Sequence, residues 1–160
     1  MFRGMRRHRQ ALAEAESIAV LERGTSGVLA VSGDDGYPYA VPLSYVYADG
    51  KLYFHCAVEG HKLDAIARNE KVSFCVIDKD QVVPEEYTTY FRSVIAFGTA
   101  RVLEQPEEKR HALELLAEKY SPEQEGRIQE IDRCFPRVCM VELSIQHLSG
   151  KQAKELVAHG

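Results

Sequence analysis

The sequence predicts a mainly β domain built as a closed or nearly closed antiparallel barrel with helices at its ends. Six segments carry the β-branched and aromatic residues that are typical of strands. Tight turns join the consecutive strands between residues 25 and 56, and such turns require antiparallel pairing. The helical segments do not alternate regularly with the strands, so a doubly wound parallel sheet is not expected.

Each element follows from a local pattern and from the residues that end it. Gly24 ends the first helix, Asp49-Gly50 is a strong hairpin signal, and Pro106 suits the first turn of a helix. A polar segment with Pro84 indicates a loop over residues 79–88. The expected strands cover residues 25–32, 37–47, 51–56, 71–78, 89–104 and 136–145. The expected helices cover residues 11–23, 60–68, 106–120 and 121–133, with one more short helix in the tail at 149–158.

The length of 160 residues suits one domain over residues 1–160, with a basic arm at 1–10 and a tail at 149–160. The chain holds 20 Lys and Arg against 24 Asp and Glu, a net charge of −4. This balance argues against a protein that binds nucleic acid through its phosphates. Four arginines lie in the arm, so the remaining residues carry −8. We expect the arm to be solvated, and either mobile or turned toward a dimer partner.

The sequence predicts a cytoplasmic protein without a metal site. No long apolar stretch follows the arginines, as a secretory signal would require, and no run approaches the roughly 18 apolar residues of a membrane span. The cysteines show neither C-x-x-C nor zinc-ligand spacing, so free thiols in a reducing compartment are expected. Spacing alone also allows a link between Cys134 and Cys139.

A candidate phosphate site lies where His61-Lys62 begins a predicted helix after Gly60. A helix N-terminus presents free N–H groups and partial positive charge, which favour an anion. A lysine in the first turn opposes the helix dipole, and a nearby anion would explain its position. A solvated helix start is the alternative. The glycine-rich dinucleotide and P-loop motifs, the G-x-S-x-G nucleophile motif and H-E-x-x-H are absent from the sequence.

Four segments together resemble the FMN-binding split-barrel superfamily. They are GVLAV at 27–31, DGYPYAVPLSYVYADGKLYFH at 35–55, EGHKLDAI at 59–66 and FRSVIAFGTARV at 91–102. Within it the chain is most similar to the Nim-type nitroimidazole-resistance proteins, which are relatives of pyridoxamine 5′-phosphate oxidase. The resemblance covers roughly residues 5–150. It implies a six-stranded antiparallel split β-barrel with Greek-key connections and flanking helices. It also implies a homodimer with one FMN at each of two sites between the subunits.

The resemblance assigns the flavin contacts residue by residue. The phosphate element, Ser-Arg-Lys in the oxidases, resembles Gly60-His61-Lys62, which is the site that the helix-start argument also selects. The oxidases begin the ring-side segment with Arg and end it with Lys, whereas Tyr39 and Ser44 stand here. Pro42 interrupts regular pairing and leaves backbone groups for a ring edge. The implied cofactor-binding residues are Val41, Pro42, Leu43, Ser44, His55, Cys56, Ala57, His61, Lys62, Ser93 and Val94.

Other residues admit two interpretations each. Strand alternation places Tyr53 and His55 on one face, where His55 is either a half-buried structural histidine or a catalytic contact beside the flavin. His147 is a weaker candidate for such a contact. Tyr87 and Tyr90 either line a substrate cleft or pack across a dimer interface. Arg92 and Arg101 are expected to form surface ion pairs.

The expected function is an FMN-dependent oxidoreductase that passes electrons from NAD(P)H or another reductant to a small acceptor of the nitroimidazole or nitroaromatic kind. The chain has no Trp and lacks the C-terminal Arg-x-His element of the oxidases, so vitamin B6 oxidase activity is not expected. One alternative is a protein that holds FMN, haem or a deazaflavin without fast turnover. A dimeric structural domain with an empty site is another. No nucleic-acid or membrane partner is expected.

Overall fold

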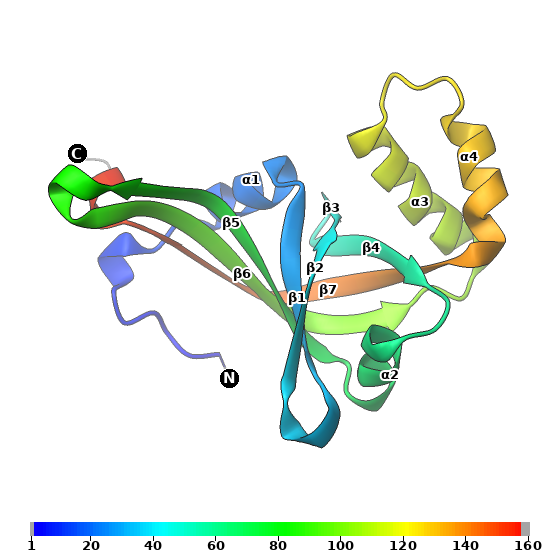
Figure 1. The fold of residues 1–160 in the computed structure, drawn as a ribbon, viewed down its shortest axis with the longest axis horizontal. Helices are drawn as coiled ribbons and strands as arrows, with labels where there is room; N and C mark the ends of the chain where they lie inside the picture. The colour runs from blue at the N-terminus through cyan, green and yellow to red at the C-terminus, as the bar shows by residue number, and fades with distance from the viewer. Residues whose placement is uncertain (1, 158–160) are drawn as a thin grey trace.

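The computed structural model describes residues 2–157, which form a mainly β fold with four α-helices (Figure 1). Met1 of the predicted arm and residues 158–160 of the predicted tail lie outside the described residues. The helices are α1 (Glu14–Arg23), α2 (His61–Arg68), α3 (Pro106–Tyr120) and α4 (Arg127–Cys134). The strands are β1 (Ser26–Ser32), β2 (Pro38–Ser44), β3 (Val46–Ala48), β4 (Lys51–Ala57), β5 (Lys71–Val83), β6 (Thr88–Val102) and β7 (Val138–Gln152).

All strand pairs in the described chain are antiparallel, as predicted, and they form one sheet in the order β2-β1-β5-β6-β7-β4-β3. The prediction of six strands is wrong, because the sheet has seven. The sheet is also not closed into a barrel by hydrogen bonds, since β2 and β3 stand at its two ends.

The additional strand arises because the expected strand at 37–47 breaks at Tyr45. This side chain is fully buried, and its hydroxyl donates to the carbonyl of Leu21 at 2.7 Å. Its backbone N–H donates to the hydroxyl of Tyr120 at 3.1 Å instead of to a neighbouring strand. The ladder therefore ends at Ser44 and begins again at Val46.

One predicted loop and one predicted helix are wrong, because strands continue through both segments. The expected loop at 79–88 is strand up to Val83, where a short 3₁₀ turn, η3 (Pro84–Glu86), reverses the chain. The strand continues beyond a register shift between Ile77 and Lys79. The expected tail helix at 149–158 is the end of β7 followed by the 3₁₀ turn η5 (Lys154–Leu156).

The helices cover the sheet in three places: α1, α2 beside β1 and β6, and the pair α3 and α4 (Figure 1). α1 begins at Glu14 rather than at 11, because Ala11 bridges to Lys151 and Leu12 donates its N–H to the Gly150 carbonyl at the edge of β7. α3 keeps its predicted bounds and lies beside α4, and together they cover part of β4 and β7. The main core lies inside the curved sheet, and a second cluster lies beneath α3.

The four cysteines are free, as predicted, so the link between Cys134 and Cys139 is absent. Among the described residues, none of the helices combines the length and apolarity needed to cross a bilayer. The same residues hold no group of three or more His, Cys, Asp or Glu side chains that is suited to a metal ion.

Candidate functional site

A split lies between the two ends of the sheet. In the described chain β2 pairs only with β1, and residues 54–57 of β4 extend beyond β3 and pair only with β7. Side chains from both segments, among them Val41 and Phe54, belong to the same core cluster, so the curved sheet brings its two ends to one core. Free strand edges present unpaired N–H and C=O groups. The split can therefore offer backbone hydrogen bonds to a ligand.

The predicted β2 segment presents two different faces. Val41 and Leu43 are half-buried and pack on the main core, whereas Pro42 and Ser44 are exposed. Only Pro42 and Ser44 are thus free to meet a ligand with their side chains. Ser44 immediately precedes the break at Tyr45, which places it at the β3 end of the split.

The predicted alternation in β4 is confirmed. Phe54 and Cys56 lie in the main core, Tyr53 lies in the cluster beneath α3, and His55 and Ala57 are exposed. His55 is exposed in this copy, whereas the structural interpretation expects it to be half-buried. Its side chain is available to a ligand.

His55 and Ser44 line one cavity with α3 and α4. Its volume is about 670 Å³, within the range of about 300–1,000 Å³ that is usual for small-molecule sites. Leu113, Leu116 and Ile131 form apolar walls, and the polar lining includes Tyr120, Gln124, Arg127, Glu130 and Cys134. The Glu130 carboxylate is paired with Arg133. The cavity thus suits a small ligand that is largely apolar.

The two basic residues at the start of α2 point to different neighbours. The ring of His61 stacks on Tyr39 at 4.0 Å, and its Nε2 lies 3.7 Å from a carboxylate oxygen of Asp34. Lys62 is half-buried, and its positive charge lowers the pKa of the Cys56 thiol. Burial, the larger effect, raises the pKa of Cys56 to about 11, so this thiol stays protonated at neutral pH.

This geometry favours Lys62 over His61 as an anion partner. Asp34 and Asp64 border the hollow of about 610 Å³ in front of His61, and Asp34 also accepts a hydrogen bond from Arg68. An anion in that hollow would meet two carboxylates. Lys62, by contrast, does not line that hollow, and its charge acts on the Cys56 thiol of β4. Gly60, with φ +149°, adopts a conformation that few other residues allow and leads directly into the helix.

Ser93 and Val94 do not join the other predicted residues within one copy of the chain. Val94 is fully buried in the main core. Ser93 therefore points to the opposite face of β6, between Ile77 of β5 and Lys151 of β7. This outer face is turned away from the main core.

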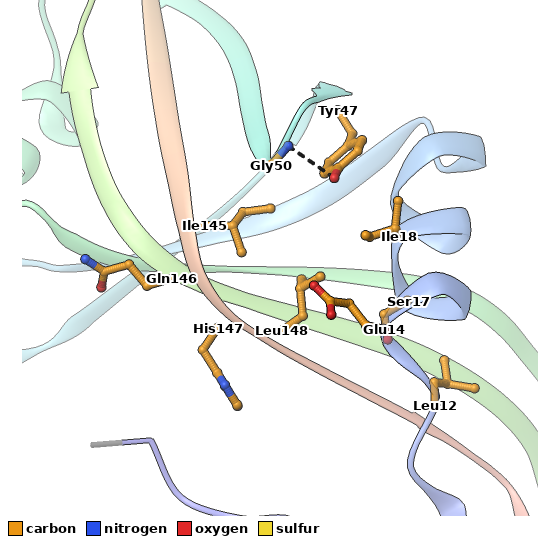
Figure 2. Close-up of a pocket in the computed structure, with 10 residues that line it drawn as sticks. All are labelled: Leu12, Glu14, Ser17, Ile18, Tyr47, Gly50, Ile145, Gln146, His147 and Leu148. Atoms are coloured by element: carbon orange, nitrogen blue, oxygen red, sulfur yellow. Dashed lines mark hydrogen bonds between the residues drawn. The ribbon is translucent and has the colours of Figure 1, made fainter.

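The remaining candidates are also placed. His147 stacks on Phe2 at 4.7 Å and lines a separate cavity of about 350 Å³ between α1 and β7, with Glu14 and Tyr47 among its walls (Figure 2). Tyr87 is 97% exposed at the turn between β5 and β6, so it lines no cleft of its own copy.

The two predicted ion-pair residues are paired. Arg92 pairs with Asp78, and Arg101 pairs with Glu108 and Glu142.

Sequence reasoning missed Tyr120, at the end of α3. Its hydroxyl oxygen lies 2.5 Å from the Tyr45 carbonyl oxygen and 2.6 Å from that of Thr25, and it accepts the Tyr45 N–H. Lys119 donates to the carbonyls of Gly24 and Tyr45, and its burial lowers its pKa. These contacts fix the chain next to Ser44. They join residues 74 to 95 positions apart, and no local pattern signals them.

The comparisons with known proteins agree with this fold. The family model described as pyridoxamine 5′-phosphate oxidase matches residues 13–152. No curated protein matches the chain. A candidate 5-nitroimidazole antibiotic resistance protein of Bacteroides thetaiotaomicron superposes with a TM-score of 0.75 at 22% identity, over 89% of this chain and 86% of that chain.

Two further solved structures are similar. A FAD-binding protein of Mesorhizobium loti has a TM-score of 0.67 at 25% identity, over 90% of this chain and 97% of that chain. A FAD- and haem-binding protein of Mycobacterium smegmatis has a TM-score of 0.76 at 21% identity, over 94% of this chain and 77% of that chain.

Proposed function

Because the chain belongs to the pyridoxamine 5′-phosphate oxidase family, we propose that it is a flavin-binding oxidoreductase with FMN in the split between β2 and β4. One observation carries the proposal: the exposed side chains of His55 and Ser44 line one cavity, and the charge of Lys62 acts on Cys56, the residue that follows His55 in β4. The solved structures described as FAD-binding and as FAD- and haem-binding support a flavin.

The residues present fit such a cofactor. Lys62 and the first N–H groups of α2 would hold the phosphate, as a point charge and as hydrogen-bond donors. The free backbone edges at 41–44 and 55–57 accept and donate hydrogen bonds at the ring edge. We propose FMN rather than FAD because this site offers one cationic anchor. When bound, the flavin supplies the electron transfer, and the protein contributes position and polarity.

The cavity beneath α3 and α4 is proposed to receive the electron acceptor. Its apolar walls suit a small planar molecule of the nitroaromatic class, and the Arg127 guanidinium at its rim suits an oxygen-bearing substituent. His55 is the proposed catalytic residue, because its exposed imidazole can donate a hydrogen bond or a proton to the acceptor.

We propose that two copies complete each site. The outer face of the sheet carries apolar side chains with no cover in one copy: Val28 is 37% exposed and Ile77 64% exposed. Ser93 lies on this same face beside Ile77. If the outer faces of two copies packed together, they would bury the exposed side chains of Val28 and Ile77. The same packing would bring Ser93 and the backbone of Val94 toward the partner's flavin. NAD(P)H is the proposed reductant.

The alternative is a protein that holds haem or a deazaflavin without rapid turnover, and the neighbour described as FAD- and haem-binding favours it. The absorbance spectrum of the purified protein separates these functions. Flavin bands that bleach under anaerobic NADH or NADPH, and return when a nitroaromatic acceptor is added, support the proposal. A Soret band supports haem, and a protein that takes up no chromophore contradicts both.

A further inference from the structure

The distal ribbon, defined as residues 77–93, has no core of its own. It comprises the end of β5, η3 and the start of β6, and none of its residues is buried. Seven residues from Ile77 to Val83 extend it by about 20 Å at about 3.3 Å per residue. It projects from one end of the molecule, and α3 and α4 lie at the other (Figure 1). Ribbons with so little buried surface are marginal in water unless something packs on them.

The end of the distal ribbon presents an aromatic side chain to solvent. Tyr87 is 97% exposed, and its backbone is left-handed, with φ +52°. Bulky residues rarely adopt this conformation. Val82, on the adjacent strand, is 68% exposed. The turn therefore exposes the Tyr87 ring to solvent, where no other residue of the same copy covers it.

The arm and the region of α3 and α4 carry opposite charge, whereas the distal ribbon itself holds four carboxylates against two Lys and Arg. The described part of the arm, residues 2–10, holds Arg3, Arg6, Arg7 and Arg9 and no carboxylate. Ala11, which follows the arm, bridges to Lys151 beside the ribbon, whereas Phe2 at its start packs against Phe97 and His147. These arginines are exposed, and none of them forms an ion pair within residues 2–157. Residues 104–134, which include α3 and α4, hold nine carboxylates against five Lys and Arg, a net charge of −4.

We infer that in the dimer the ribbon end of each copy docks on α3 and α4 of the other, with Tyr87 at the mouth of the cavity that contains His55. This deepens the proposed function, since it rests on the proposed homodimer. A two-fold axis makes the contact reciprocal, so that the positive arm of each copy meets the negative helices of its partner. The cavity of one copy is then closed by a residue from the other.

The charges near the contact are consistent with this arrangement. The turn also carries Glu85 and Glu86, which would be repelled by an acidic surface. Arg127, which lines the cavity, has no carboxylate partner within residues 2–157 and can pair with one of these two glutamates. Ile77 belongs to both the distal ribbon and the apolar outer face, so the docking surface continues the proposed interface.

Cross-linking tests the arrangement without any flavin. Cys134 lines the cavity, so the Tyr87→Cys variant places a second thiol at its mouth. All variants carry Cys75→Ser, which removes the half-buried thiol of the outer face. Mild oxidation with diamide should give a covalent dimer whose linked peptides contain positions 87 and 134. A disulfide requires Cα atoms within about 7 Å, so random collision should not produce this pair efficiently.

The Tyr37→Cys variant is the matched control, because Tyr37 is 76% exposed at a different turn and should give no such dimer. Adding Cys134→Ser to the Tyr87→Cys variant should abolish the cross-link. Sedimentation should also show weaker dimers at 0.5 M than at 0.05 M salt, and weaker still when the four arm arginines are replaced by Gln. A monomeric wild-type chain, or a dimer that links position 87 elsewhere, overturns the inference. A correct cross-link in a chain that binds no flavin would leave the inference standing and reject the proposed function.

Discussion

The Tyr120→Phe substitution should loosen the chain beside Ser44 by removing one oxygen atom. That hydroxyl accepts the N–H of the fully buried Tyr45 and donates to a carbonyl of Tyr45 or Thr25. An unsatisfied buried N–H costs about 1–3 kcal/mol, and a lost hydrogen bond contributes about 0.5–1.5 kcal/mol. We therefore expect the free energy of unfolding to fall by about 2–4 kcal/mol.

Urea denaturation followed by circular dichroism measures this change. With a slope of about 2 kcal/mol per molar urea, the midpoint should fall by about 1–2 M. Tyr37→Phe is the control, because Tyr37 is 76% exposed and its variant should stay within about 0.5 kcal/mol of the wild type. A Tyr120→Phe midpoint equal to that of the control would refute the idea that this hydroxyl holds the break between β2 and β3.

Three further predictions concern the fold and the interface. The hydrogen bond from Arg23 lowers the pKa of the Asp78 carboxyl, and burial opposes this shift. The ionised carboxylate therefore stabilises the fold above about pH 4, and this stabilisation is lost as the pH falls through the lowered pKa. In an acid titration, the Asp78→Asn variant should lose stability less steeply than the wild type. In Gly98→Ala the new Cβ would lie 2.0 Å from the Ser144 carbonyl oxygen, so we expect a loss of about 2 kcal/mol in urea melts, whereas Gly126→Ala, with open space, should lose far less. Val28→Asp should weaken self-association in sedimentation without unfolding the chain, and an unchanged dimer would argue against the outer face as the interface.

The sequence predicted features that depend on neighbouring residues. The bounds of α3 follow from Pro106 and its apolar periodicity, and the exposure of His55 follows from alternation along β4. The position of His61-Lys62 at the start of α2 follows from Gly60. In each case the pattern that determines the structure lies within a few residues of it.

Features that depend on distant contacts could not be predicted in this way. The break at Tyr45 depends on Tyr120, 75 residues later. The turn of His61 toward Asp34 depends on how α2 packs beside the β1–β2 turn. The cavity at His55 needs α3 and α4, whose sequences show amphipathic helices but not where those helices lie. Strand pairing also extended β5 through a polar segment that composition alone assigned to a loop.

The central claim is that a flavin phosphate binds at Lys62, and titration of the cofactor-free protein with FMN tests it most directly. Charged hydrogen bonds contribute about 1.5–3 kcal/mol, so Lys62→Ala should weaken FMN binding by about 10- to 100-fold. Riboflavin, which lacks the phosphate, should bind the wild type and the variant equally, and Lys79→Ala, on the distal ribbon, should bind FMN like the wild type. If Lys62→Ala bound FMN as tightly as the wild type, or lost riboflavin to the same extent as FMN, the proposed phosphate site would be wrong.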